Sequence, residues 1–242
     1  MKHRFWWGLL TLLLLVAPRG AGAGGVTPAT LQGLITEVQS GYFLLSDATL
    51  GEVRVNLDDT LTRYEGVASE ATLAPGQYVY VDYSGVMTRS LPPQVTALKV
   101  RCFTVSGSVS EILQSGFLVT GDPVLGDVVI HIGEGMPTVF QGVPITVYFS
   151  GVMAMSMPPQ VQADYLVVPM LNGTASDVAA DSFTLTDSQG AGFRVALQPD
   201  TRMQQLPAQG DAVCVYYSGQ TESDGAIVAL EVAAQGSVGA AE

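Results

Sequence analysis

Short stretches of alternating apolar and polar residues fill most of this chain and predict β-strands. A strand turns successive side chains to opposite faces, so an alternation such as Glu52-Val53-Arg54-Val55 is typical of a strand with one buried face. Turn-forming Gly, Pro, Asp and Asn separate these stretches. The pattern therefore predicts an all-β protein made of many short strands.

The predicted strands recur in three copies. The stretch 83–87, Tyr-Ser-Gly-Val-Met, returns at 149–153 as Phe-Ser-Gly-Val-Met, and Pro-Pro-Gln-Val at 92–95 returns at 158–161, so the offset is 66 residues. Tyr-Ser-Gly at 217–219 is a third, shorter copy. A fixed period is typical of a repeat protein. We predict three repeats, over residues 26–103, 104–169 and 170–235.

Each repeat shows the same order of features. A glycine opens the first strand, and an aromatic residue ten positions later opens the second; the glycines are Gly33, Gly107 and Gly173, and the aromatics are Phe43, Phe117 and Phe183. We expect the aromatics to be buried. Five strands follow per repeat, with the longest connection between the third and the fourth, where residues 68–73 favour a turn of helix. This layout predicts three tandem five-stranded OB-like small barrels.

The N-terminus has the features of a cleavable signal peptide. Lys2 and Arg4 precede an apolar run from Phe5 to Ala17, and Ala21-Gly22-Ala23 is a small-residue cleavage site. The alternative is an uncleaved membrane anchor, but the run is shorter than the roughly 20 residues that span a bilayer. We expect residues 1–23 to be removed, and the protein to be secreted or extracytoplasmic in the cell envelope without a membrane attachment.

The chain is acidic. Its formal net charge is −12, and loss of the leader would remove three of its 10 basic residues and none of its 22 acidic ones. Nucleic acid is therefore not an expected partner, because phosphate binding needs clustered Lys and Arg. Two interpretations of the acidity are open: a solvated surface, or a face that binds cations.

No catalytic motif is present in the sequence. Outside the leader there is one histidine, His131, and no Gly-x-Ser-x-Gly, His-Glu-x-x-His or phosphate-binding Gly-rich motif. We expect no enzymatic activity and no cofactor. Cys102 and Cys214 allow either a disulfide between repeats one and three or two free thiols.

The duplicated stretch before the last strand has a structural and a functional interpretation. Structurally, Gly85 and Gly151 permit a turn that other residues avoid, and the Pro-Pro pairs hold the chain extended. Functionally, residues of repeats one and two would line a shallow groove at the mouth of each barrel. These candidate ligand-binding residues are Tyr83, Met87, Gln94, Phe149, Met153 and Gln160.

A metal site is a second hypothesis for repeat two. Met153, Met155 and Met157 alternate, so an extended backbone would place three thioethers on one face, with His131 as a fourth ligand. Thioethers are soft ligands that favour Cu(I). The competing interpretation is apolar filling, because Met87 and Leu91 occupy matching positions in repeat one.

The chain resembles tandem β-barrel repeats of exported bacterial proteins, which are domains of unknown function. Repeat three carries the resemblance in 173–178, 183–187, Thr201, Gly210-Asp211 and Asp224-Gly225; repeats one and two resemble a related group with Ser-Gly-x-Met and Pro-Pro-Gln-Val. The resemblance implies OB-like barrels and no particular chemistry. We expect an exported, non-enzymatic binding or scaffolding protein that contacts an envelope polymer, glycan or protein, with extracytoplasmic Cu(I) handling as the alternative.

Overall fold

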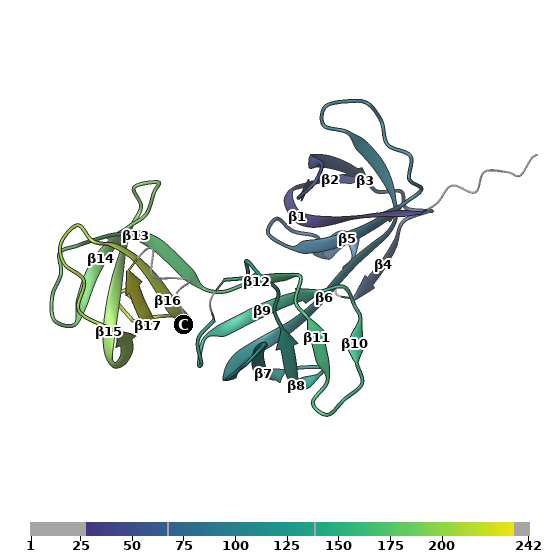
Figure 1. Cartoon of the computed structure of the whole chain (residues 1–242). Helices are drawn as coiled ribbons and strands as arrows, with labels where there is room; N and C mark the ends of the chain where they lie inside the picture. Colours follow the sequence, from purple (N-terminus) through teal and green to yellow (C-terminus); the bar gives the residue numbers. More distant parts are fainter. Residues whose placement is uncertain (1–27, 67, 138, 235–242) are drawn as a thin grey trace, which may run out of the picture.

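The computed structural model describes residues 28–66, 68–137 and 139–234. Among these residues the regular structure is β-strand apart from one 3-10 helix, η1 (Glu70–Thr72), inside the segment expected to form a helical turn. None of their helices is long and apolar enough to cross a membrane. The all-β prediction is confirmed (Figure 1). The predicted signal peptide, residues 1–23, lies outside the described residues.

Repeats one and two share a single twelve-stranded sheet. Its first strands are β1 (Ala29–Gln39), β2 (Tyr42–Asp47), β3 (Gly51–Asn56), β4 (Arg63–Gly66) and β5 (Tyr78–Tyr83). The long strand β6 (Gln94–Leu113) then runs from repeat one into repeat two. The remaining strands are β7 (Gly116–Asp122), β8 (Gly126–His131), β9 (Pro144–Phe149), β10 (Met153–Ala154), β11 (Gln160–Gln162) and β12 (Tyr165–Val167).

In repeat one the strand pairing leads back to the first strand, because β5 pairs with β1. β1 pairs with β2 and β5, β2 pairs with β3, and the first half of β6 pairs with both β3 and β5. In repeat two the second half of β6 takes the place of β1 and pairs with β7 and β9. β7 then pairs with β8, β8 pairs with β11, and β9 pairs with β12. The predicted boundary after residue 103 therefore falls inside one strand that belongs to both repeats.

Repeat three is a closed barrel with the strand order β13-β14-β15-β17-β16. Its strands are β13 (Met170–Ser176), β14 (Ser182–Thr186), β15 (Gly192–Met203), β16 (Ala212–Thr221) and β17 (Ile227–Ala234). Val168 and Pro169 separate β12 from β13, so no strand is shared here. Proline cannot donate to a sheet ladder, which explains the interruption.

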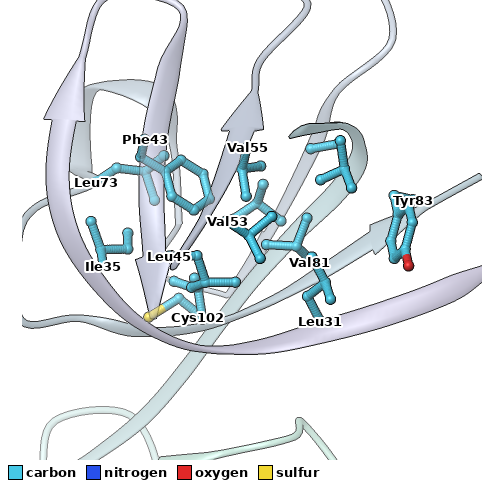
Figure 2. Close-up of a cluster of buried hydrophobic side chains, with 14 of the residues drawn as sticks. Leu31, Ile35, Phe43, Leu45, Val53, Val55, Leu73, Val81, Tyr83 and Cys102 are labelled. Carbon is cyan, nitrogen blue, oxygen red and sulfur yellow. The ribbon is translucent and has the colours of Figure 1, made fainter. Parts of the chain in front are cut away.

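Each repeat buries its predicted aromatic residue. Phe43, Phe117 and Phe183 are at most 1% exposed, and each belongs to a separate hydrophobic cluster. Figure 2 shows the Phe43 ring near Val55 and Leu73 in the cluster of repeat one. The expectation that these three side chains occupy buried positions is confirmed.

The glycine that opens each repeat lies where the backbone of the second strand comes close to that of the first. A Cβ atom at any of these positions would lie 2.0–2.3 Å from a carbonyl oxygen of the second strand. Real Cβ atoms do not approach this closely, so a side chain would push the strands apart. Close approach of two backbones thus explains the repeated Gly33, Gly107 and Gly173.

An aspartate fixes the hairpin between the second and third strands. In repeat two, Asp122 Oδ1 accepts hydrogen bonds from Val124 N at 2.9 Å and Leu125 N at 2.8 Å, and Oδ2 accepts one from Ser106 N at 2.9 Å. Asp47 makes the same three kinds of contact in repeat one. The carboxylate therefore closes the turn and ties it to the first strand.

We expect acid to weaken the fold through Asp122. Burial raises the pKa of this carboxyl, but the three backbone N–H donors outweigh burial, so its pKa lies below the ordinary value. The unfolded chain then binds the proton more readily. The stabilisation is complete above the unfolded pKa, about 3.9, and is lost as pH falls through the lower folded pKa. Urea unfolding between pH 7 and pH 2 measures this loss.

The matched variant is Asp122→Asn. An amide has a single acceptor oxygen, so at pH 7 the variant should lose about 1–3 kcal/mol of unfolding free energy. Its stability should also depend less on pH below pH 4. A variant with the same acid dependence as the parent protein would contradict the role of Asp122.

Tyrosines fill the junction between repeats one and two. The rings of Tyr78 and Tyr165 are stacked with centroids 5.4 Å apart, and Tyr148 lies against both at 6.5 and 6.2 Å. The Tyr80 hydroxyl donates a hydrogen bond to the Asp164 carboxylate across the same junction. Aromatic contacts and a charge-assisted hydrogen bond thus add to the covalent continuity of β6.

The two cysteines lie in different places and are free thiols. Cys102 is buried in the cluster of repeat one, which also contains Tyr148. Cys214 is buried with Val143 and Tyr216 where repeats two and three meet. Burial raises the pKa of Cys102 to about 11, so its thiol stays protonated. The structure therefore has the two unpaired thiols rather than the disulfide considered above.

Candidate functional site

The duplicated stretch forms two matching loops, loop one (84–93) between β5 and β6 and loop two (150–159) between β9 and β11. The second residue of each loop is a glycine of positive φ, 83° at Gly85 and 90° at Gly151. This conformation favours glycine and confirms the predicted turn. Each loop also has a cis peptide bond before its first proline, Pro92 or Pro158.

Hydrogen bonds hold both loops in one conformation. The Ser90 hydroxyl donates to the Pro92 carbonyl oxygen at 2.7 Å, and the Ser156 hydroxyl donates to the Pro158 carbonyl oxygen at 2.7 Å. The base of loop one is closed by Thr88 N and Gln94 O at 3.0 Å. In loop two, β10 pairs with β11 at the same place. Both loops are therefore closed at the base and hydrogen-bonded within.

The ends of these hairpins present apolar side chains to solvent. In loop one, Val86 is 66% and Leu91 is 97% exposed, and we call this pair tip one. In loop two, Val152 is 76%, Met155 is 91% and Met157 is 100% exposed, and we call this set tip two. Leu91 and Met157 occupy matching positions immediately before the cis proline. Sequence reasoning did not single out Val86, Leu91 or Val152 as surface residues.

The predicted groove residues divide into buried and partly buried positions. Tyr83 and Phe149 are buried in the clusters of repeats one and two, so they support the loops and do not line a surface. This corrects the groove hypothesis for both residues. Their positions follow from strand alternation, which turns Tyr83 inward with Val81.

Met87 and Met153 are also core-supporting residues. Met87 is partly buried against the cluster of repeat one, and Met153 is partly buried against that of repeat two. Each follows the loop glycine by two residues and packs back against the buried cluster of its own repeat. The loops therefore rest on methionines at their bases, whereas their tips are free of such contacts among the described residues.

Gln94 and Gln160 lie at the edge of a polar surface beside the loops. In repeat one, the Arg54 guanidinium lies 3.7 Å from the centre of the Tyr42 ring, and its Nε donates to Asn56 Oδ1 at 3.0 Å. Asn56 Nδ2 in turn lies 3.5 Å from Gln94 Oε1. In repeat two, His131 Nε2 lies 2.9 Å from Gln160 Oε1. The structure thus brings His131 together with Gln160.

The surface residues Tyr42, Arg54 and Asn56 were missed by the sequence analysis. A usable signal was present, because Asn56 and His131 both end the third strand of their repeats. Aligning the third strands would have paired these two polar side chains; their contacts with Gln94 and Gln160 come from the fold.

The four proposed copper ligands are not on one face. Met153 packs against the core of repeat two, Met155 and Met157 are exposed, and the His131 nitrogens contact Gln160 and Ser115. The backbone bends after Ala154, so the extended geometry assumed for the three methionines is absent. Within the described part of the chain, no group of three or more His, Cys, Asp or Glu residues is placed to hold a metal ion.

Repeat three has a polar hollow lined largely by residues of β15. The hollow has a volume of about 270 Å³, and its lining includes Asp181, Arg194, Gln198 and Glu222. Gln198 Nε2 donates to Glu222 Oε1 at 2.8 Å, so these lining groups already satisfy one another. Repeat three therefore differs in surface chemistry from the other two.

A family model matches part of the chain. The family described as Domain of unknown function (DUF5666) matches residues 32–87. This match lies in repeat one, whereas the residues named above for the resemblance to exported repeats lie in repeat three, and repeats one and two resemble a related group. No curated protein matches the chain.

Two solved structures are similar over most of the chain but at low scores. One is a multidomain protein with nucleic acid binding domains from Streptococcus pneumoniae TIGR4, with 12% identity and a TM-score of 0.21 over 86% of this chain and 73% of that chain. The other is Drosophila Unr CSD456, with 10% identity and a TM-score of 0.21 over 86% of this chain and 97% of that chain. At these scores they carry no argument about binding.

Proposed function

We propose that this protein is an exported, non-enzymatic binding protein built from three OB-like barrels, and that repeats one and two bind a partner protein of the cell envelope through tips one and two. The observation that carries the proposal is the exposure of Leu91 and Met157, 97% and 100%, at matching places in ordered loops. Burying such a side chain against a partner contributes about 1.5–3 kcal/mol. Contiguous exposed apolar surface marks protein-binding sites, and the proposal is that Val86 with Leu91, and Val152 with Met155 and Met157, form such a surface on each loop.

The OB-like part of the proposal rests on strand order. In repeat three the first strand, β13, pairs with the second and the fourth, and the third pairs with the fifth. Repeat one has the same pairing. Its additional strand, β4, pairs with β6. This order and the long connection after the third strand are those of a small OB-type barrel. The proposed export rests on the leader-like residues 1–23.

Tip chemistry favours a protein over a glycan as the partner. A glycan presents many hydroxyl groups, and each buried hydroxyl needs a hydrogen-bond partner. The side chains of Leu91 and Met157 offer no strong donor or acceptor. The negative net charge of −12 disfavours nucleic acid for the reason given above. Copper handling is less well supported, because Met153 faces the core rather than the other thioethers.

The test is a double substitution, Leu91→Asp with Met157→Asp, in the full chain. A carboxylate at each tip would have to lose its water on binding, so we expect capture of the partner from solubilised cell envelope to fall at least tenfold. The thermal midpoint should change little, since both parent side chains are almost fully exposed. Immobilised protein and quantitative mass spectrometry give the measurement.

The matched control is Leu61→Asp with Val124→Asp. These apolar residues are 54% and 87% exposed and lie outside loops one and two. The control variant gains the same two negative charges, but at positions outside the tips, so it should still capture the partner. Equal capture by the tip variant and the control would refute binding through the tips.

A further inference from the structure

Arg54 carries a fixed guanidinium group whose outer N–H groups are unused. Its central carbon lies 3.7 Å from the centre of the Tyr42 ring, and its Nε donates to Asn56 Oδ1 at 3.0 Å. Asn56 is held in turn by Gln94, at 3.5 Å. These contacts orient the guanidinium and occupy its Nε. Its other two nitrogens, Nη1 and Nη2, make no hydrogen bond to any residue that the structure describes.

Other arginines use their guanidinium groups within the fold. Arg101 Nη2 pairs with Asp82 Oδ1 at 2.9 Å, and Arg194 Nη1 pairs with Asp224 Oδ2 at 2.6 Å. Arg54 takes part in none of the ion pairs within 28–66, 68–137 and 139–234. The chain has 22 acidic residues, yet this oriented cation is left without a carboxylate partner.

The matching positions of repeats two and three are different. The register of the second and third strands matches Arg54 with Val129 in repeat two and with Arg194 in repeat three. In repeat three the residue that matches Tyr42 is Ser182, so no aromatic ring lies at that place, and Arg194 is ion-paired as described. The stacked and unpaired arginine is therefore a property of repeat one.

Arg54 adjoins the end of loop one. Its backbone N donates to the Pro93 carbonyl oxygen at 2.9 Å, and it lies opposite Gln94 in the β3–β6 ladder. Leu91, which is 97% exposed in tip one, precedes Pro93 by two residues, a chain distance of at most about 7 Å. A stable protein interface covers about 800 Å² of each partner. A protein seated on tip one is therefore wide enough to contact Arg54.

The unused end of the guanidinium fits a carboxylate. Its two outer N–H groups are parallel, so they match the two oxygens of one carboxylate in a charge-assisted pair. A phosphate group fits less well, because phosphate binding relies on clustered basic residues. Arg54 stands alone in its contact network, and the exposed Glu52 two residues earlier adds negative charge.

We infer that Arg54 binds a carboxylate of the partner protein, from an Asp, a Glu or the C-terminus, beside the apolar surface that covers tip one. The contacts of Arg54 define the carboxylate site, and the assignment of the carboxylate to the partner rests on the proposed function. Repeat two has Val129 at this place and makes no such demand. Arg54 thus gives tip one a specificity for acidic partners that tip two lacks.

The first experiment is a zero-length cross-link on the full chain. Arg54→Lys places an amine at the site, and a carbodiimide joins an amine to a carboxylate that touches it. Outside the leader the natural chain has a single lysine, Lys99, so few amines compete. We expect mass spectrometry to find position 54 joined to a carboxylate of the protein that the parent chain captures from solubilised envelope. Arg63→Lys, at an exposed position of β4, is the control and should not be joined to it.

Three results of this experiment would overturn the inference. These are no link at position 54, a link only to carboxylates of this chain, and a link to an acidic glycan. Each leaves the proposed function standing if the variant with Leu91→Asp and Met157→Asp still loses the partner. If that variant keeps the partner, the proposed function fails as well.

The second experiment measures affinity for the purified partner. Arg54→Gln removes the charge and should weaken binding by about tenfold to 100-fold, whereas Arg63→Gln should bind like the parent protein. Changing the cross-linked carboxylate of the partner to its amide should cause a similar loss, and the two changes together should cost little more than either alone. Full affinity in Arg54→Gln, or losses that simply add, would overturn the contact between Arg54 and the carboxylate.

Discussion

Replacing Gly107 by alanine is expected to unfold repeat two or to destabilise the protein by about 4 kcal/mol or more, a loss that few single substitutions cause. The added Cβ would lie 2.3 Å from the carbonyl oxygen of Thr120 and 2.8 Å from Val119 Cγ1. A backbone oxygen in a sheet cannot move without breaking the β6–β7 ladder. Urea unfolding followed by circular dichroism measures the change.

Gly133→Ala is the matched control for this substitution. Gly133 lies in the same repeat, a Cβ there meets nothing within 4 Å, and its φ is outside the left-handed region. We expect its unfolding free energy to change by less than about 1 kcal/mol. If Gly107→Ala were as mild as Gly133→Ala, the close approach of β6 and β7 would be refuted.

Truncation of Phe117 to alanine should cost about 3–5 kcal/mol, the usual range for removing a buried aromatic ring. Phe117 is 1% exposed in the cluster of repeat two, where Ile130 lies opposite it in the sheet register. Removal of the ring leaves a cavity that the surrounding valines cannot fill unless the strands move. Equilibrium unfolding in urea gives the loss.

Two further variants separate burial from strand propensity. Phe117→Leu keeps most of the volume and should cost clearly less than the alanine change. Ile112→Ala lies on β6 but at a half-exposed position, so it should cost about 1 kcal/mol or less. A loss for Phe117→Ala no greater than that for Ile112→Ala would contradict a core role for the ring.

The sequence was sufficient for features that depend on alternation and turns. The buried phenylalanines and the glycine of each loop were predicted because strand period and positive φ leave direct marks on residue choice. The inward direction of Tyr83 was also available from its alternation with Val81. Assigning Tyr83 to a surface groove ignored that pattern.

Features that depend on how distant segments meet were not predictable in the same way. Gly107 was interpreted as the start of a new strand, although β6 continues through it. The contacts of Arg101 with Asp82 and Ser150 join residues 19 and 49 positions away. The bend after Ala154 separates thioethers that an extended chain would align. No local pattern records these arrangements.

The continuity of β6 also limits how the chain length can vary. A strand alternates its side chains with a period of two, so inserting or deleting one residue between Val100 and Val109 would turn the inward side chains of one repeat outward. Such a change would also rotate loop two away from Arg101. An added residue at the first junction therefore inverts one repeat, whereas Val168 and Pro169 belong to no strand, so an added residue there would not invert the alternation of a strand shared by two repeats.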